Sequence, residues 1–287
     1  MTRRIGVHLG TSGGVSNTVL RAKEIGANTF QIFSSSPRQW RAAAVDLKEA
    51  ERLRDLRAQY DVGPLVVHTS YLVNLCSVTE DVRRKSVDAF RGEMERALTL
   101  GAEYLVLHPG SWKGMTRNEG LKLAAESIES AIDGLPWQGT QFSILIENTA
   151  GSECSLGGSL DQVAELVMLL RNHAPVAVCL DTCHTHVAGY DIVSESGYED
   201  TMIQIEATVG FDAVRVWHCN DAKAARGSKL DRHQHIGMGT IGTAAFRRLL
   251  NDPRFAQSAF IAETPVDEDG DEASNVSALK SLVTKTT

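Results

Sequence analysis

The sequence contains no long apolar run. Hydrophobic residues make up 43% of the 287 positions, yet no stretch reaches the roughly 18 consecutive apolar residues of a membrane-spanning helix. The first residues, Met-Thr-Arg-Arg-Ile-Gly, carry two positive charges, but the apolar segment of a signal peptide does not follow them. We therefore expect a cytoplasmic protein with no membrane partner.

Cysteine is scarce, and its spacing is uninformative. The five cysteines are an odd number, and none of them forms a C-x-x-C pair. A disulfide framework is therefore not expected, and a reducing cytosol fits this usage best. We expect the cysteines to be small buried residues rather than reactive thiols.

An excess of positive charge is missing as well. The chain has 29 Lys and Arg against 36 Asp and Glu, a net charge of -7. Loose binding to nucleic acid usually requires a basic surface, so the charge alone argues against it. That argument weakens if several acidic side chains bind metal, because divalent cations are often the largest local charges in a site.

The chain alternates between strand-like and helical patterns. Short β-branched runs predict eight strands: Ile5–Leu9, Thr29–Phe33, Leu65–Val67, Tyr104–Leu107, Phe142–Ile146, Val176–Leu180, Ala213–Trp217 and Ala259–Ala262. Apolar residues at helical spacing lie between them, and no linker or charge block divides the chain. Parallel strands with crossover helices form an open sheet or a barrel. Eight units of this length favour one α/β domain, a single (β/α)8 TIM barrel over residues 1–287.

Most of the predicted strands end in a metal-binding residue type. Six of the eight do so, and three more such residues follow nearby. The nine candidates are His68, His108, Glu147, Asp181, His184, His218, Asp231, His233 and Glu263. The carboxyl ends of barrel strands converge on one face, so these side chains are expected to meet in one bowl. Imidazole and carboxylate groups suit zinc, and also manganese and iron.

Each residue alone is weak evidence. A strand-end His is more often a hydrogen-bonded core or rim residue, and a strand-end Asp or Glu can simply cap the next helix. The joint pattern is stronger, because burying so many unpaired charges without cations would be very costly. A polynuclear site of this kind polarises phosphoryl groups. Of the other histidines, His8 is expected to support the bowl, His173 to lie in a surface loop, and His186 and His235 to support the site or be exposed.

Several segments resemble the endonuclease IV family of apurinic/apyrimidinic endonucleases. They follow the family order through nearly the whole chain, and several are five residues or longer. The segments are Arg38–Arg41 (RQWR), His68–Leu75 (HTSYLVNL), His108–Ser111 (HPGS), Ile146–Gly151 (IENTAG), Cys179–His184 (CLDTCH), Ala188–Asp191 (AGYD), His218–Lys223 (HCNDAK), Asp231–His233 (DRH) and Gly237–Gly242 (GMGTIG).

This resemblance implies a xylose-isomerase-like barrel that holds three Zn²⁺ ions. It would cleave duplex DNA on the 5′ side of abasic sites, leaving a 3′-hydroxyl and a 5′-deoxyribose phosphate. Carried over by position, the first zinc would be bound by His68, His108 and Glu147. Glu147, the implied catalytic residue, would bridge to a second zinc bound by Asp181, His218 and Glu263. The third would be bound by His184, Asp231 and His233. Manganese suits the same ligands.

The resemblance also implies DNA contacts. Tyr71 would wedge into the base stack with Leu72 beside it, and Arg38 would fill the gap left by displaced nucleotides. The other reading is that these side chains only pack on the rim. Ser36 and Pro37 depart from the family pattern, in which polar amide residues are common, so the contacts of that loop are not fixed by the resemblance.

The segment between His218 and His235 is rich in positive charge. Lys223, Arg226, Lys229 and Arg232 lie where phosphates approach, or they are solvated loop charges. Three Zn²⁺ would add six positive charges against the net -7, leaving the loaded protein close to neutral. We expect a monomer acting on duplex DNA.

Two other functions use the same residues. Sugar isomerases and epimerases share this barrel and hold one metal with a Glu, Asp, His and Glu set, which Glu147, Asp181, His218 and Glu263 would supply. The five remaining candidate ligands would then have no role. A non-catalytic zinc scaffold is disfavoured, because structural zinc sites are usually Cys-rich and closed.

Overall fold

The computed structural model describes residues 2–284. Eight parallel strands close into a barrel in the order β1-β10-β7-β6-β5-β4-β3-β2. Their bounds are β1 (Arg4–His8), β2 (Thr29–Phe33), β3 (Leu65–His68), β4 (Tyr104–Leu107), β5 (Ser143–Glu147), β6 (Val176–Asp181), β7 (Val214–His218) and β10 (Ala259–Ala262). The predicted (β/α)8 barrel is confirmed.

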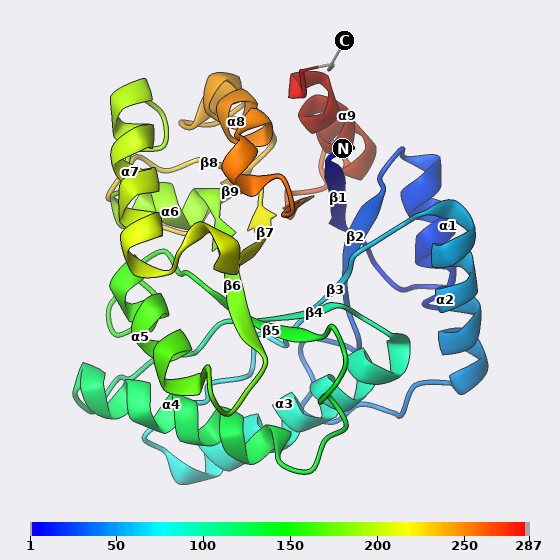
Figure 1. Cartoon of the computed structure of the whole chain (residues 1–287), viewed down its shortest axis with the longest axis vertical. Helices are drawn as coiled ribbons and strands as arrows, with labels where there is room; N and C mark the ends of the chain where they lie inside the picture. The colour runs from blue at the N-terminus through cyan, green and yellow to red at the C-terminus, as the bar shows by residue number, and fades with distance from the viewer. Residues whose placement is uncertain (1, 285–287) are drawn as a thin grey trace.

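Helices surround the strands in chain order, and the C-terminal helix α9 lies beside the N-terminal strand β1 (Figure 1). Their bounds are α1 (Asn17–Glu24), α2 (Leu47–Tyr60), α3 (Glu80–Leu100), α4 (Arg117–Ile132), α5 (Leu160–Leu170), α6 (Thr182–Ala188), α7 (Glu195–Thr208), α8 (Gly242–Asn251) and α9 (Glu272–Leu282). Within residues 2–284, no helix combines the length and apolar character needed to cross a membrane.

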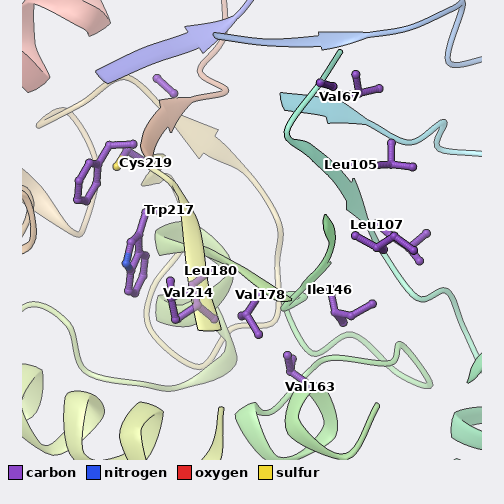
Figure 2. Packing of buried hydrophobic residues seen from close by; sticks show 14 of the residues in the cluster. Val67, Leu105, Leu107, Ile146, Val163, Val178, Leu180, Val214, Trp217 and Cys219 are labelled. Carbon is purple, nitrogen blue, oxygen red and sulfur yellow. The ribbon is translucent and has the colours of Figure 1, made fainter. Parts of the chain in front are cut away.

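The core has two layers. The outer layer packs the helices against the barrel, and Figure 2 shows Val163 of α5 near Ile146 of β5 and Val178 of β6. A smaller cluster consists of strand residues only and fills the barrel interior. Its buried members are Val66, Val106, Leu145, Ala177, Cys179, Val216, Ala259 and Ile261. A layer of apolar side chains therefore lies beneath these strand ends.

The pleat of the strands connects this interior layer to the predicted ligands. Alternate residues of a strand face the same side, so the residue two positions after an interior residue also points inward. Val66 is followed in this way by His68, and Leu145 by Glu147. The same step leads from Val106, Cys179, Val216 and Ile261 to His108, Asp181, His218 and Glu263. The alternation thus aims six candidate ligands into the bowl.

Three short elements were not expected from the sequence. Helix α6 begins immediately after β6 and is capped by Asp181, whose Oδ1 accepts a hydrogen bond from the His184 backbone N–H at 2.7 Å. Strands β8 (Asp221–Ala222) and β9 (His233–Gln234) form a small antiparallel pair after β7. This pair places His233 near the bowl. Sequence periodicity could not reveal elements of this length.

We predict that Gly6→Ala destabilises the barrel. A methyl group at Gly6 would overlap the backbone carbonyl oxygen of Thr29, its partner in the neighbouring strand β2. Backbone cannot rotate away, so β1 and β2 would have to separate, at a cost of about 1–3 kcal/mol. Thermal unfolding should show a lower Tm. The control is Gly10→Ala, where a methyl group meets no atom within 4 Å; equal Tm values for the two variants would contradict this packing argument.

Candidate metal centre

The nine predicted ligands gather at the carboxyl ends of the strands. A cavity of about 520 Å³ opens there. Its lining residues are His8, Phe33, His68, Tyr71, His108, His184, Asp231, Arg232, His233, Glu263, Thr264 and Pro265. Glu147, Asp181 and His218 lie beneath it and are fully buried. The candidates fall into three groups in which the potential ligand atoms all lie within 4.8 Å of one another.

The first group contains His68, His108 and Glu147. Both imidazole Nε2 atoms face the same carboxylate oxygen: Glu147 Oε2 lies 3.3 Å from His68 Nε2 and 3.2 Å from His108 Nε2. The three residues come from β3, from the residue that follows β4, and from β5, which are neighbouring strands. Barrel order thus places them side by side.

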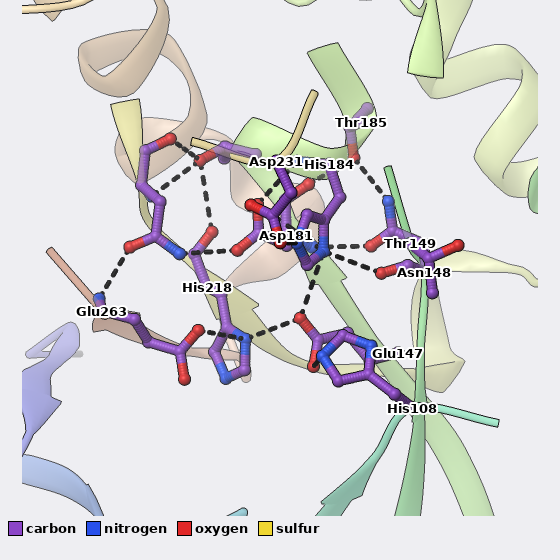
Figure 3. A network of polar contacts seen from close by, with 12 residues as sticks. His108, Glu147, Asn148, Thr149, Asp181, His184, Thr185, His218, Asp231 and Glu263 are labelled. Atoms are coloured by element: carbon purple, nitrogen blue, oxygen red, sulfur yellow. Dashed lines mark hydrogen bonds and ion pairs between the residues drawn. The ribbon is translucent and has the colours of Figure 1, made fainter. Parts of the chain in front are cut away.

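The second group contains Glu147, Asp181, His218 and Glu263. Here Glu147 uses its other oxygen, and Oε1 lies 3.0 Å from His218 Nδ1 (Figure 3). The same His218 nitrogen lies 3.2 Å from Glu263 Oε2. Asp181 is opposite His218 in the register of β6 and β7. One buried carboxylate therefore faces two groups at once, the arrangement of a bridging ligand.

The third group contains His184, Asp231 and His233. Asp231 Oδ2 lies 3.2 Å from His184 Nε2, and Oδ1 lies 3.1 Å from His233 Nε2. The Asp231 side chain is 54% exposed, so this group is the most open to solvent. Helix α6 positions His184 and strand β9 positions His233, so two of the three unexpected elements serve this part of the site.

Three of these histidines are oriented by backbone carbonyls. The Nδ1 atoms of His68, His184 and His233 lie 2.8, 2.9 and 3.0 Å from the carbonyl oxygens of Thr69, Asn148 and Glu263. A carbonyl accepts only, so each Nδ1 carries the proton. In the neutral imidazole the lone pair is then on Nε2, directed into the site. Metal-binding histidines usually show this arrangement.

Two buried asparagines, which sequence reasoning missed, form hydrogen bonds to Asp181 and Glu263. Asn148 Oδ1 accepts the Asp181 backbone N–H at 2.7 Å, and Asn220 Nδ2 donates to Asp181 Oδ2 at 2.5 Å. Asn220 Oδ1 also accepts the Glu263 backbone N–H at 2.6 Å. Their motifs, I-E-N and H-C-N, were visible in the sequence, but amides are not metal-ligand types and were not singled out. Gln31 was missed for the same reason.

The centre concentrates negative charge. Within residues 2–284, the ion pairs of Glu147, Asp181, Asp231 and Glu263 are formed with histidines alone. Burial disfavours the charged form of Glu147, yet His108 and His218 outweigh it and hold the pKa well below its usual range. The donor set therefore fits divalent cations, which would neutralise these carboxylates.

Several histidines have pKa values shifted in the opposite direction, whereas burial lowers the pKa of His108 to about 4. Burial favours the neutral imidazole of His233, but Asp231 and Asp181 prevail and raise its pKa to about 9. His184 likewise has a pKa raised well above the usual range against the effect of burial, because of Asp181, Asp231 and Glu147. The carboxylates draw protons onto imidazoles that a metal would require to be neutral, so metal and proton compete here.

Two cysteines also lie close to these groups. The Cys179 sulfur lies within 4.8 Å of potential ligand atoms of Glu147 and His218, and the Cys183 sulfur within 4.8 Å of those of Asp181 and His233. Burial raises the pKa of each thiol to about 12. Only the thiolate is a strong metal ligand, so the imidazoles are better ligands here. Both cysteines are buried, as the sequence predicted.

The remaining histidines lie outside the three groups. His8 lines the cavity, 3.0 Å from the Gln31 side chain. His173 is exposed, as predicted. His186 and His235 are both buried. Their Nε2 atoms lie 3.1 Å from the Thr240 hydroxyl and 2.8 Å from an Asp267 carboxylate oxygen.

Of the predicted DNA-contact residues, Tyr71 lines the cavity. Tyr71 is 69% exposed and packs edge-on against Phe33, with ring centroids 5.3 Å apart. Leu72 is half-buried and Arg38 is exposed. The Ser70 hydroxyl donates to the Pro37 carbonyl at 2.7 Å. This bond ties the loop that carries Arg38 to the loop that carries Tyr71.

The cations after β7 differ in their surroundings. Arg226 pairs with Asp191 at 2.5 Å, so its charge is already engaged. Arg232 is exposed and lines the cavity. Lys223 and Lys229 lie outside the residues that line it. Of these four, Arg232 is best placed to meet an anion in the bowl.

Comparison with known proteins finds full-length relatives. Residues 19–283 match the family model described as a xylose isomerase-like TIM barrel. A probable endonuclease 4 from Solibacter usitatus is 47% identical over 281 residues, which are 97% of this chain and 96% of the relative. Endonuclease IV from Thermus thermophilus superimposes with a TM-score of 0.86 at 34% identity, covering 97% and 98% of the two chains. A D-tagatose 3-epimerase-like protein shares the fold alone, with a TM-score of 0.70 at 19% identity over 96% of each chain.

We predict that metal stabilises the fold more at pH 9 than at pH 6.5. His233 has an ordinary pKa of 6.5 in the unfolded chain and a pKa of about 9 in the folded, metal-free protein. Its protonation therefore stabilises the fold fully below pH 6.5, and this stabilisation is lost as the pH rises through about 9. Bound metal would take the place of the proton. The difference in Tm between zinc-loaded and chelator-treated protein should therefore widen over this pH range.

The control for this measurement is His173→Gln, which changes an exposed histidine outside the centre and should behave like the unmodified protein. A difference in Tm that stays constant with pH would contradict the competition between metal and proton.

Proposed function

This chain belongs to the endonuclease IV family of the xylose isomerase-like TIM barrels, and on that premise we propose that it repairs DNA at abasic sites. It hydrolyses the phosphodiester bond 5′ to an abasic site in duplex DNA and leaves a 3′-hydroxyl and a 5′-deoxyribose phosphate. One observation carries the proposal: three groups of imidazoles and carboxylates converge in one bowl, and Glu147 joins two of them.

The centre takes three Zn²⁺ ions, with Mn²⁺ as a substitute at one or more positions. His68, His108 and Glu147 hold the first ion, and Glu147 with Asp181, His218 and Glu263 holds the second. His184, Asp231 and His233 hold the third. Bound ions would neutralise charge on a phosphodiester and lower the pKa of water towards neutrality. Four carboxylates and five imidazoles supply oxygen and nitrogen ligands for this purpose.

The chain's own residues bind and orient the substrate. Arg232, at the cavity wall, is placed to meet a phosphate entering the bowl. The backbone carbonyls behind His68, His184 and His233 keep the imidazole rings fixed as the substrate arrives. Glu147 would be the bridging ligand. It has no solvent exposure, so its position is set by β5 rather than by the substrate.

Selectivity for abasic sites comes from the rim. Tyr71 inserts into the base stack, Leu72 packs beside it, and Arg38 occupies the space vacated by the displaced nucleotide. An abasic nucleotide neither stacks nor pairs well, so displacing it costs less than displacing an intact one. The enzyme acts as a cytoplasmic monomer with no membrane partner.

The alternative is a sugar isomerase or epimerase with one metal. The group of Glu147, Asp181, His218 and Glu263 would serve such an enzyme. The likeness to an epimerase concerns the fold alone, at 19% identity. His68, His108, His184, Asp231 and His233 would have no role around a single ion, which favours the endonuclease.

We predict lesion-dependent incision that requires Glu147. The protein loaded with zinc should cut a duplex carrying one tetrahydrofuran abasic site on its 5′ side and leave an intact duplex uncut, with about three ions per chain by elemental analysis. Glu147→Gln should slow incision by about 100-fold or more, equivalent to about 2.7 kcal/mol of barrier.

The control is Glu126→Gln, an exposed residue of α4, which should leave incision unchanged. One ion per chain with no incision would refute the proposal and direct the search to ketose substrates.

We also predict that Tyr71→Ala impairs the enzyme on duplex DNA in particular. Stacking of an aromatic ring on a base contributes about 1–3 kcal/mol, so incision of an abasic duplex should slow by about 5- to 150-fold. An abasic single strand has no stack to open and should be affected much less. Tyr71→Phe, which keeps the ring, should retain activity on both substrates. Equal losses on the two substrates would contradict the wedge role.

A further inference from the structure

The side chain of Gln31 joins three titratable residues at the floor of the centre. Gln31 lies in β2 and is fully buried. Its Oε1 lies 2.8 Å from His218 Nε2. Its Nε2 donates to Glu263 Oε1 and lies 3.0 Å from His8 Nδ1. One neutral side chain thus contacts two of the proposed ligands of the second ion and a histidine behind them.

We propose that Gln31 is a positioning residue that fixes the proton of His218 on Nε2 and orients Glu263 for metal. It acts through these ligands and touches neither metal nor DNA. The inference rests on the proposed function only in assuming that the centre binds metal.

His218 differs from the other oriented histidines. His68, His184 and His233 direct Nδ1 to backbone carbonyls, which leaves Nε2 for the site. In His218 the roles are reversed, because Nδ1 faces Glu147 and Glu263 at 3.0 and 3.2 Å. Its Nε2 therefore needs an acceptor on the other side of the ring. The Gln31 amide oxygen is that acceptor.

The contacts determine the orientation of the amide. With the oxygen toward His218, the amide nitrogen faces Glu263 and donates to its carboxylate. A flipped amide would place its oxygen against the Glu263 carboxylate, two acceptors with no proton between them, and would present a donor to the His218 N–H. Because the amide N–H group also reaches His8 Nδ1, that nitrogen acts as the acceptor and the His8 proton is on Nε2.

Other side chains at position 31 would not form both hydrogen bonds, to His218 and to Glu263. Glutamate has the same shape, but its ionised form cannot donate to Glu263 and would add a like charge beside it. Methionine fills a similar volume and forms neither hydrogen bond. Strand pairing holds Gln31 opposite His8 on one side and Val66 on the other, so its reach to His218 and Glu263 is set by the barrel.

The first test uses the unmodified protein, labelled with ¹⁵N-histidine and loaded with zinc. Nitrogen chemical shifts distinguish a ring that carries its proton on Nε2 from one that carries it on Nδ1. We expect His218, assigned by comparison with His218→Asn, to carry the proton on Nε2 and to show a slowly exchanging N–H signal. A proton on Nδ1 would overturn the proposal.

The second test compares Gln31→Met with Thr29→Val. Thr29 is buried in the same strand and donates to the Pro64 carbonyl, so its replacement also removes a buried hydrogen bond from β2. Zinc affinity is measured by competition with a chelator, without DNA, and Co²⁺ binding by visible absorption. In Gln31→Met one ion should bind about 10- to 100-fold more weakly, with a changed cobalt spectrum. Thr29→Val should bind all ions normally.

Two results would overturn the inference: unchanged metal affinity in Gln31→Met, or an equal loss in Thr29→Val, which would indicate a general effect on the strand. A different result would refute the proposed function. An unmodified protein that binds metal but does not incise abasic DNA would refute that function while leaving the metal affinities to decide the role of Gln31.

Discussion

Buried negative charge is the constraint on which the centre depends. Glu147 and Asp181 have no exposed surface, and no Lys or Arg among residues 2–284 pairs with either of them. An uncompensated buried carboxylate is very costly. Protonated imidazoles can supply the compensating charge here; with metal bound, the imidazoles would be neutral ligands and the metal ion would supply that charge. The same cluster can thus exist in a protonated and a metal-bound form.

The barrel provides the rigidity that this cluster needs. Beneath each strand-end ligand lies an apolar interior residue of the same strand, as with Leu145 below Glu147. Register then fixes which ligands are neighbours, and it places Asp181 opposite His218. A site built on strand ends keeps its geometry better than one built on loops alone. Asp231, the most exposed of the nine, lies in a loop.

The sequence predicted the parts that follow a local rule. Strand runs and interior alternation depend on periodicity, so the barrel and the convergence of the strand-end candidate residues could be predicted without a structure. Helix α6 could not, because it is short and its cap, Asp181, had already been read as a ligand. The structure shows that Asp181 caps the helix through Oδ1 and leaves Oδ2 toward the site. Capping and ligation had seemed to be alternatives, but the geometry permits both.

The supporting amides could not be predicted, for a different reason. Asn148, Asn220 and Gln31 act through partners that are distant in sequence; Gln31 and His218, for example, are 187 positions apart. Which side chains meet depends on barrel closure and register, and a single sequence does not display either. Gln31 also lies inside a strand rather than at its end, so a search of strand ends passes over it.

The net negative charge of the chain also determines how the protein would attract DNA. A net charge of -7 opposes DNA at long range, and Arg232 is the only Lys or Arg among the described residues that line the cavity. In the proposed reaction the metal ions must therefore supply most of the attraction for phosphate, as well as the chemistry. Metal removal would then weaken DNA binding together with cleavage. Rim residues such as Tyr71 lie outside the ligand groups, so their loss would affect recognition while the centre stays loaded. In the proposed reaction, attraction for phosphate and catalysis would both come from the metal ions, and selectivity would come from the rim.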